Sequence, residues 1–194
     1  MKKFLSLITL AAVISGAAGA ALEFRLGKSP ETPKTDHKIG KDEYRYGISS
    51  SVIISEKTKL KALRNVTMYV ARNDENLYLA ASSPLAAYSN IPLTAKDEII
   101  FTVRTASGEE LKRSVNPKMV PSTGKNWHWE TAIPWSELGG EPEQGEVWDI
   151  TVTRKFQSPV ESATISTKVT FDDDAPGIKY SIVHGDPTGQ FYQI

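Results

Sequence analysis

Two tryptophans that stand one residue apart are the side chains of this sequence best suited to binding a ligand. Trp127 and Trp129 fall in the run Asn-Trp-His-Trp-Glu, and residues two apart on a strand point to the same face. Flat aromatic rings match the C–H-rich faces of pyranose sugars and offer a large contact area. We expect a sugar platform if this face opens to solvent. If the face points inward, Trp129 is a core residue and Trp127 closes one end of the fold.

A glutamate and an arginine form the second candidate set. Arg154 ends a run in which Trp148 and Val152 alternate with polar residues, so it is expected on an apolar strand face. A buried arginine needs a carboxylate or carbonyl partner, because an unpaired buried charge is costly. Glu130, on the neighbouring predicted strand, is the candidate partner. The alternative is that Arg154 donates hydrogen bonds to a ligand hydroxyl at the rim of the fold.

Three consecutive aspartates form the third candidate site. Asp172, Asp173 and Asp174 follow a predicted strand that ends at Phe171. Adjacent carboxylates repel one another unless they are solvated or neutralised, and calcium takes oxygen ligands from such loops. The spacing is not that of an EF-hand loop, which alternates its ligands around a central glycine. The sequence therefore predicts either a structural calcium site or a solvated acidic turn here.

Catalytic motifs are missing from the sequence. There is no Gly-x-Ser-x-Gly elbow, no P-loop and no dinucleotide-binding fingerprint. The absence of cysteine from this chain excludes thiol catalysis and thiolate metal sites, and the three histidines lack the spacing of a zinc site. The glutamates at 137, 141 and 143 surround glycines and a proline in a predicted exposed loop, which gives no support to a glycosidase pair. We therefore predict no catalytic residue and no enzyme activity.

Length and charge indicate one globular domain with neutral partners. The 194 residues are 40% hydrophobic and 24% charged, which suits a domain with a single core. Basic and acidic residues are equal at 23 each, so nothing favours nucleic acid or an anionic membrane surface as a partner.

The N-terminus has the organisation of a secretory signal peptide. Two lysines precede an apolar run of about ten residues, and Ala18-Gly19-Ala20 supplies small residues for cleavage. The run is too short to span a bilayer, and no later segment is apolar enough to do so. We expect residues 1–20 to be removed near Ala20, leaving a secreted or periplasmic product without membrane insertion.

The rest of the chain reads as strands. Residues 21–47 are polar and are predicted as an extended lead-in with one early strand near 22–26. Residues 66–72 alternate in hydropathy, turn at 73–76 and return at 77–81, which predicts a β-hairpin. Similar alternation at 98–104 and 163–171 extends the pattern. We predict an all-β domain over 48–194, an antiparallel β-sandwich of about ten strands with immunoglobulin-like or jelly-roll-like layers.

The two tryptophan-containing segments together resemble the signature of family 9 carbohydrate-binding modules and their DOMON-like relatives. The pattern is Trp-x-x-Glu-x-x-Ile-Pro-Trp-x-x-Leu-Gly, a short gap, and then Gly-x-x-Trp-x-x-x-x-x-Arg. Its positions in this chain are Trp127, Glu130, Ile133, Pro134, Trp135, Leu138, Gly139, Gly145, Trp148 and Arg154.

This resemblance implies a β-sandwich, often stabilised by calcium, that binds an oligosaccharide or polysaccharide and is commonly joined to a glycoside hydrolase. For this chain we expect non-catalytic glycan binding, beside a separately encoded hydrolase. One alternative is a structural or protein-interaction sandwich that has lost sugar binding, which the lack of an opening tryptophan segment in residues 22–50 favours. A second alternative is a haem-binding DOMON-like redox domain that uses Met68 or Met119 as a ligand.

Overall fold

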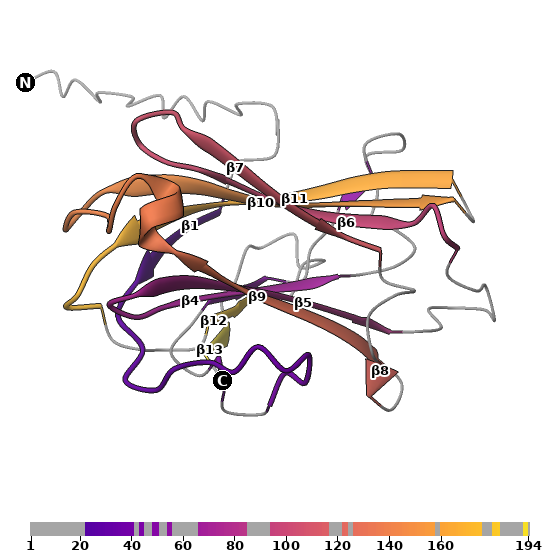
Figure 1. The fold of residues 1–194 in the computed structure, drawn as a ribbon, viewed down its shortest axis with the longest axis horizontal. Helices are drawn as coiled ribbons and strands as arrows, with labels where there is room; N and C mark the ends of the chain where they lie inside the picture. The colour runs from indigo at the N-terminus through magenta and orange to yellow at the C-terminus, as the bar shows by residue number, and fades with distance from the viewer. Residues whose placement is uncertain are drawn as a thin grey trace, which may run out of the picture.

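The computed structural model describes residues 22–40, 43–44, 48–50, 54–55, 66–84, 94–116, 122–123, 126–157, 160–175, 180–182 and 192–193. These residues form strands in two sheets that pack face to face, with one short 3-10 helix at one end (Figure 1). Among them, no helix has the length and apolarity needed to cross a membrane.

The first sheet is built around a long hairpin. Its strands are β1 (Leu22–Leu26), β3 (Ile54–Ser55), β6 (Glu98–Arg104), β7 (Glu110–Val115), β10 (Val147–Gln157) and β11 (Val160–Phe171). They lie in the order β1-β11-β10-β6-β7, and β3 also pairs with β11. The β10–β11 hairpin is antiparallel along its whole length, from Val147 opposite Thr170 to Gln157 opposite Val160.

The second sheet holds the predicted hairpin of residues 66–81. Its strands are β2 (Ile48–Ser50), β4 (Thr67–Arg72), β5 (Asn76–Pro84), β8 (Ser122–Thr123), β9 (Asn126–Pro134), β12 (Tyr180–Ile182) and β13 (Tyr192–Gln193). The order is β13-β12-β2-β4-β5-β9-β8. Among the strands that the structure describes, the pairs are antiparallel except for two parallel ones, β1 with β11 and β12 with β2.

Alternating side chains from the two sheets meet to form one core. Buried members include Ile99, Phe101 and Val103 of β6, and Leu77 and Leu79 of β5. Each such side chain contributes about 1.5–3 kcal/mol by leaving water. The alternation of apolar and polar residues that predicts the strands therefore also places their apolar side chains in the core.

The chain crosses from the second sheet to the first through a short helical turn. β9 ends at Pro134, and η2 (Trp135–Leu138) follows as a single 3-10 turn. Gly139 then adopts φ 85, and the Gly140 N–H donates to the Trp135 carbonyl at 2.9 Å. This left-handed conformation suits glycine, which has no Cβ to clash. Gly139 thus ends the helical turn, and Pro134 precedes its first residue.

The segment after β1 passes across the outer face of the second sheet (Figure 1). We call its described residues, 29–40 and 43–44, the strap. Tyr44 of the strap is buried against Ala71, Tyr78 and Ala80 of β4 and β5, which forms a small apolar cluster separate from the core. The strap therefore covers part of the outer face of the second sheet.

The all-β sandwich predicted from the sequence is confirmed, with more strands than the ten expected because several pair over only two or three residues. The early strand near 22–26 is also confirmed. Phe24 and Leu26 are core residues and β1 pairs with β11, so the packed domain includes residues before the predicted boundary at 48. The signal peptide, residues 1–20, lies outside the described residues and stays a prediction.

Candidate functional site

Trp129, one half of the predicted sugar platform, lies in the core. Its side chain is 9% exposed, and its ring packs against Phe101 of the opposite sheet with the centroids 5.3 Å apart. A ring enclosed in this way presents no face to a ligand, so the core alternative holds for Trp129. The backbone of Trp127 pairs with Ser83 and Ser122 at the far end of β9 from η2. Its side chain lies outside what the structure describes, and its role in binding stays a prediction.

The predicted ion pair between Glu130 and Arg154 is wrong. Arg154 follows Ile150 and Val152 on the face of β10 that points into the core, and it is 0% exposed. Glu130 neighbours Trp129 on β9 and points to the opposite, outer face of the second sheet. The two strands are consecutive in the chain but not neighbours in space, because η2 carries the chain from one sheet to the other.

Glu130 is buried beneath the strap at 3% exposure. Its Oε2 accepts a hydrogen bond from the Lys38 N–H at 3.1 Å, and its own N–H donates to His37 Nδ1 at 3.3 Å. Burial, reinforced by the nearby Glu43 carboxylate, raises the pKa of Glu130 to about 7. The residue therefore joins the strap to the sheet and is not open to a sugar.

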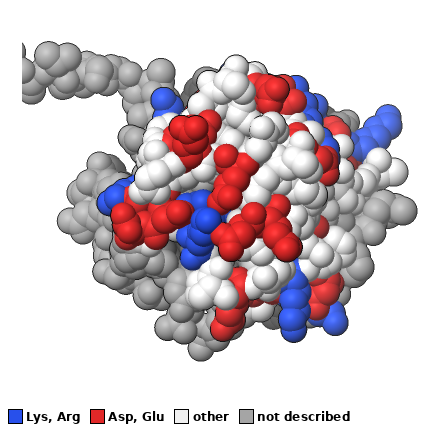
Figure 2. Space-filling model, turned by 60° about the vertical axis from the view of Figure 1, so that its left-hand side comes forward, with Lys and Arg blue, Asp and Glu red and all other residues white. Residues whose placement is uncertain are grey.

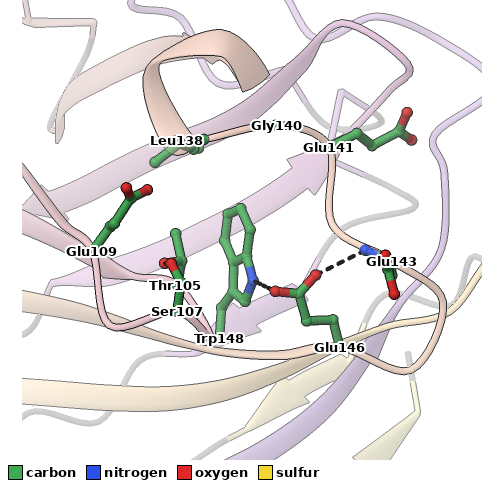
Figure 3. Close-up of a pocket in the computed structure, with 10 residues that line it drawn as sticks. Thr105, Ser107, Glu109, Leu138, Gly140, Glu141, Glu143, Glu146 and Trp148 are labelled. Carbon is green, nitrogen blue, oxygen red and sulfur yellow. Dashed lines mark hydrogen bonds between the residues drawn. The ribbon is translucent and has the colours of Figure 1, made fainter.

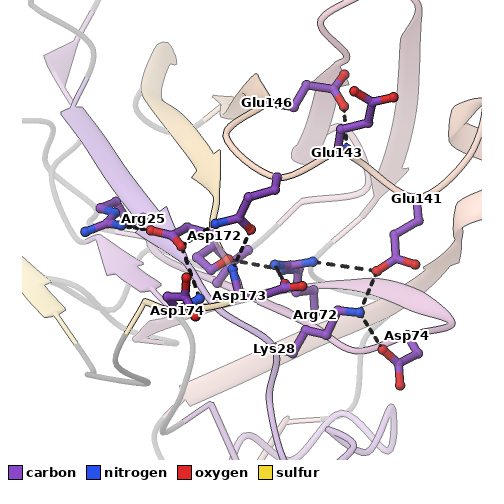
Figure 4. Close-up of polar contacts among 12 residues, drawn as sticks. Arg25, Lys28, Arg72, Asp74, Glu141, Glu143, Glu146, Asp172, Asp173 and Asp174 are labelled. Carbon is purple, nitrogen blue, oxygen red and sulfur yellow. Dashed lines mark hydrogen bonds and ion pairs between the residues drawn. The ribbon is translucent and has the colours of Figure 1, made fainter.

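The aspartate turn has arginine partners. Asp172 is buried and forms an ion pair with Arg25 (Figure 4). Its Oδ1 also accepts from Gln144 Nε2 at 2.7 Å and from the Asp174 N–H at 3.1 Å. These contacts use both oxygens of Asp172, so this carboxylate is not free to chelate an ion. Asp173 and Asp174 are exposed, which agrees in part with the predicted solvated turn.

The second arginine is Arg72, at the end of β4. Its guanidinium is 2% exposed, forms an ion pair with Asp173 and lies 3.7 Å from Glu141 Oε1. The Nε donates to the Leu26 carbonyl at 3.1 Å, and the guanidinium carbon sits 5.3 Å from the centre of the Phe171 ring. One buried cation thus ties together the ends of β1, β4 and β11.

These contacts do not fit the calcium that the family resemblance implies. Asp172 and Asp173 already face arginines, whose positive charge opposes a second cation. Across the described ranges, no three acidic or histidine side chains converge in a way that would hold a metal ion. Met68, named for the haem alternative, is fully buried in the apolar core. Met119 lies outside the described residues.

A pocket of about 470 Å³ opens at the η2 end of the sandwich, between the β6–β7 turn and the loop that joins η2 to β10 (Figure 3). Its polar lining comes from Thr105, Ser107 and Glu109 of the turn and from Glu141, Glu143 and Glu146 of the loop. A second pocket of about 350 Å³ adjoins it, sharing Glu109 and extending to Glu137.

Glu146 is the best fixed of the pocket glutamates. Its Oε1 accepts from Trp148 Nε1 at 2.9 Å, and its Oε2 accepts from the Glu143 N–H at 2.8 Å. Trp148 in turn packs edge-to-face on Phe171 and Trp135, with centroids 4.9 and 6.1 Å away. This carboxylate is therefore positioned by the rigid end of the core, although it belongs to a loop (Figure 3).

The opposite wall of the pocket approaches the glycine that ends η2. A Cβ placed on Gly139 would lie 2.7 Å from Glu109 Oε2, so the absence of a side chain at 139 leaves room for this carboxylate. The hydroxyls of Thr105 and Ser107 lie 2.7 Å apart beside it. The pocket thus collects carboxylate and hydroxyl oxygens from two loops that are distant in sequence.

Acidic side chains gather in several groups on this end of the molecule, with basic ones between them (Figure 2). Lys28 pairs with Asp74 at 2.7 Å and with Glu141 at 2.9 Å, which raises the pKa of its ammonium to about 12. No ion pair engages Glu109, Glu143 or Glu146 within the described part of the chain. The pocket therefore offers hydrogen-bond acceptors to a ligand rich in hydroxyl or ammonium donors.

Sequence reasoning does not reveal this pocket. It predicts an apolar strand face that includes Trp148 and a loop over residues 137–143, of which the structure places 137 and 138 in η2. It could not show that the loop faces Glu109, because that contact depends on how the sheets stack. The local signals were the closely spaced glycines 139, 140 and 145, all with positive φ in the structure, and a glutamate two residues before Trp148.

Comparison with known proteins shows which solved structures share this fold. No protein-family model matches the chain, and no curated protein matches it. Among solved structures, a family 9 carbohydrate-binding module from Caldicellulosiruptor kristjanssonii in complex with cellotriose superposes with a TM-score of 0.54. It is 13% identical and covers 85% of this chain and 100% of that one. A family 9 module from the same organism in complex with glucose gives a TM-score of 0.50 at 13% identity, over 84% and 100% of the two chains.

The chain therefore has a β-sandwich fold like that of family 9 carbohydrate-binding modules, as the resemblance of its tryptophan segments predicts. At 13% identity the likeness concerns the fold. What this chain binds has to be argued from its own residues.

Proposed function

We propose that this protein is an exported, non-catalytic glycan-binding domain. The observation that carries the proposal is the acceptor-rich pocket at the η2 end of a sandwich whose structural neighbours were solved with cellotriose and glucose. Sugar hydroxyls are hydrogen-bond donors, and hydrogen bonds to ionised acceptors are stronger than those between neutral groups. Export rests on the apolar leader of residues 1–20.

The pocket is preferred to the tryptophan platform because of where the predicted residues lie. Trp129 and Arg154 face the core, and Glu130 is beneath the strap. Glu146 and Glu109, in contrast, line an open pocket of about 470 Å³, which falls within the usual size range of small-molecule sites. A short glycan bound mainly by such polar contacts would have a micromolar to millimolar dissociation constant, roughly −8 to −4 kcal/mol.

Calorimetric titration against a panel of oligosaccharides, beginning with glucose and cellotriose, tests this function. The Glu146→Gln and Trp127→Ala variants locate the site. Loss of binding only in Glu146→Gln supports the pocket, and loss only in Trp127→Ala supports the far end of β9. A panel in which no sugar binds the folded wild-type protein would refute glycan binding.

The alternative function is a protein-interaction sandwich without a sugar site. The burial of Trp129, Arg154 and Glu130 favours it, because three of the four side chains expected to touch sugar are enclosed. An absence of sugar binding would move the proposal to this alternative. A separately encoded glycoside hydrolase remains the proposed partner if sugar binds.

A further inference from the structure

The buried carboxyl of Glu130 makes a direct polar contact between the strap and the second sheet. The strap amide of Lys38 donates to Glu130 Oε2, and His37 of the strap accepts from the Glu130 N–H. The strap is otherwise attached near its start, where the Ser29 N–H donates to the Arg72 carbonyl at 2.7 Å. Asn73 Nδ2 also donates to Thr32 Oγ1 at 3.2 Å.

Glu130 is incompletely satisfied in its buried position. Its Oε1 makes no hydrogen bond although it is enclosed, and the same holds for the hydroxyl of Tyr44, which faces the carboxyl from the strap. A protonated carboxyl can donate to that hydroxyl, whereas a carboxylate relies on receiving hydrogen bonds. The Tyr44 hydroxyl can itself donate such a bond, so either protonation state of Glu130 can pair the two oxygens. The neutral form is favoured instead by the burial of the carboxyl.

The charged groups around Glu130 act in the same direction. Asp36 and Glu43 of the strap both disfavour a second negative charge at Glu130. In the described residues, no lysine or arginine forms an ion pair with it. On its own strand, His128 lies two residues away on the same outer face, and burial lowers the pKa of that imidazole. A neutral imidazole supplies no positive charge that would stabilise a Glu130 carboxylate. On β5 the residue opposite Glu130 is Ala80, which carries no charge.

We propose that the strap is a pH-operated latch, closed over the outer face of the second sheet while Glu130 is protonated and opened when Glu130 ionises. Both ends of the strap lead into strands, β1 in the first sheet and β2 in the second. Opening is therefore local. It exposes the ring of Tyr78, which is 3% exposed beneath the closed strap, and the half-buried ring of Tyr69.

The direction of the switch follows from linkage. Glu130 has a pKa of about 7 under the strap and an ordinary value of 4.5 once solvated. The closed form therefore retains a proton that the open form releases, and raising the pH between these values favours opening. Across the full interval the ratio of open to closed strap rises by about a hundredfold or more.

A histidine switch would work in the opposite sense. His37 Nδ1 accepts a hydrogen bond from the Glu130 N–H, and a protonated imidazole nitrogen cannot accept. If His37 controlled the strap, acid would open it and base would close it. The sign of the pH response thus separates the two groups.

Hydrogen exchange of the full protein between pH 5 and pH 8 tests the latch. After correction for intrinsic exchange rates, protection of the Ser29 and Lys38 amides should fall about a hundredfold relative to amides of β10 as the pH rises. Glu130→Gln, which keeps the shape but cannot ionise, should show flat protection. Glu31→Gln removes an exposed carboxylate of the same segment and should behave as the wild type.

Three results would overturn the proposal: constant strap protection in the wild type, the same fall in Glu130→Gln, or protection that rises with pH. Tyr44→Phe supplies a second test if Glu130→Gln does not fold. The Tyr44 hydroxyl lowers the Glu130 pKa, so its removal should move the midpoint of the fall to higher pH. An unchanged midpoint would exclude Glu130 as the latch.

Discussion

Arg72 and Asp173, 101 residues apart in sequence, form an ion pair in which the arginine is almost completely buried and the aspartate is not. Arg72 ends β4 in one sheet, and Asp173 follows β11 in the other. The pair therefore fastens the two sheets at the η2 end (Figure 4). It places a protein cation at the turn where the sequence predicts either a calcium site or a solvated acidic turn.

Removal of the buried guanidinium should destabilise the fold. Arg72→Ala loses the contact with Asp173, the hydrogen bond to the Leu26 carbonyl and the packing on Phe171. We expect a loss of about 2–4 kcal/mol, because the abandoned carboxylate can still be solvated. Urea unfolding followed by tryptophan fluorescence measures it as a lower midpoint at unchanged slope. The exposed pair of Arg104 and Glu110 is the control, since solvent screens it and Arg104→Gln should leave the urea midpoint nearly unchanged. Equal costs for the two variants would contradict a central role for Arg72.

Calcium should leave the stability of the wild-type protein unchanged. Asp172 and Asp173 are engaged by Arg25 and Arg72, so no ligand set remains at this turn for the ion. Melting curves in millimolar calcium and in excess chelator should agree to within about 1 °C, because only a ligand of the native state raises the melting temperature. A rise that grows with calcium concentration would restore the calcium prediction and place its site elsewhere.

Local features of this fold are readable from the sequence, and cross-sheet features are not. The β4–β5 hairpin and the turn at η2 follow from hydropathy alternation, proline and glycine, which act over a few residues. The error over Glu130 and Arg154 arose at η2, where the sequence does not reveal that the chain changes sheets. The contact between Lys38 and Glu130 joins residues 92 apart in the sequence, and the hydropathy pattern of neither segment predicts it.

Charge at the pocket should control sugar affinity if the pocket is the binding site. Glu146→Gln removes the negative charge but keeps an acceptor for Trp148 Nε1. Replacing a charge-assisted hydrogen bond to a sugar hydroxyl by a neutral one should weaken binding about tenfold. Calorimetric titration with the tightest sugar of the panel measures the change. Glu98→Gln, on β6 away from the pocket, is the matched control, and an equal effect of both changes would point to a general charge effect.

Gly139 should tolerate alanine less well than another glycine of the same conformation. Gly139 and Gly108 have φ of 85 and 89, so each substitution forces a side chain into the left-handed region at about 1 kcal/mol. At Gly139 the new methyl also meets Glu109 Oε2, whereas at Gly108 nothing lies within 4 Å. We expect a slightly greater loss of stability for Gly139→Ala than for Gly108→Ala, together with altered sugar binding because Glu109 must move. Unaltered binding in a folded Gly139→Ala protein would argue against Glu109 as a contact.

Global stability should fall as the pH rises from about 4.5 to about 7 through the contribution of Glu130. Its pKa is raised in the folded protein, so the unfolded chain ionises first and gains free energy over this interval, while above about 7 both states are ionised and the contribution is constant. The total change is up to about 3 kcal/mol. Glu130→Gln removes it, so the variant should approach wild-type stability near pH 4.5 and exceed it at pH 8. Urea unfolding of both proteins across this range tests the sign, and parallel curves would show that Glu130 is not buried in its neutral form.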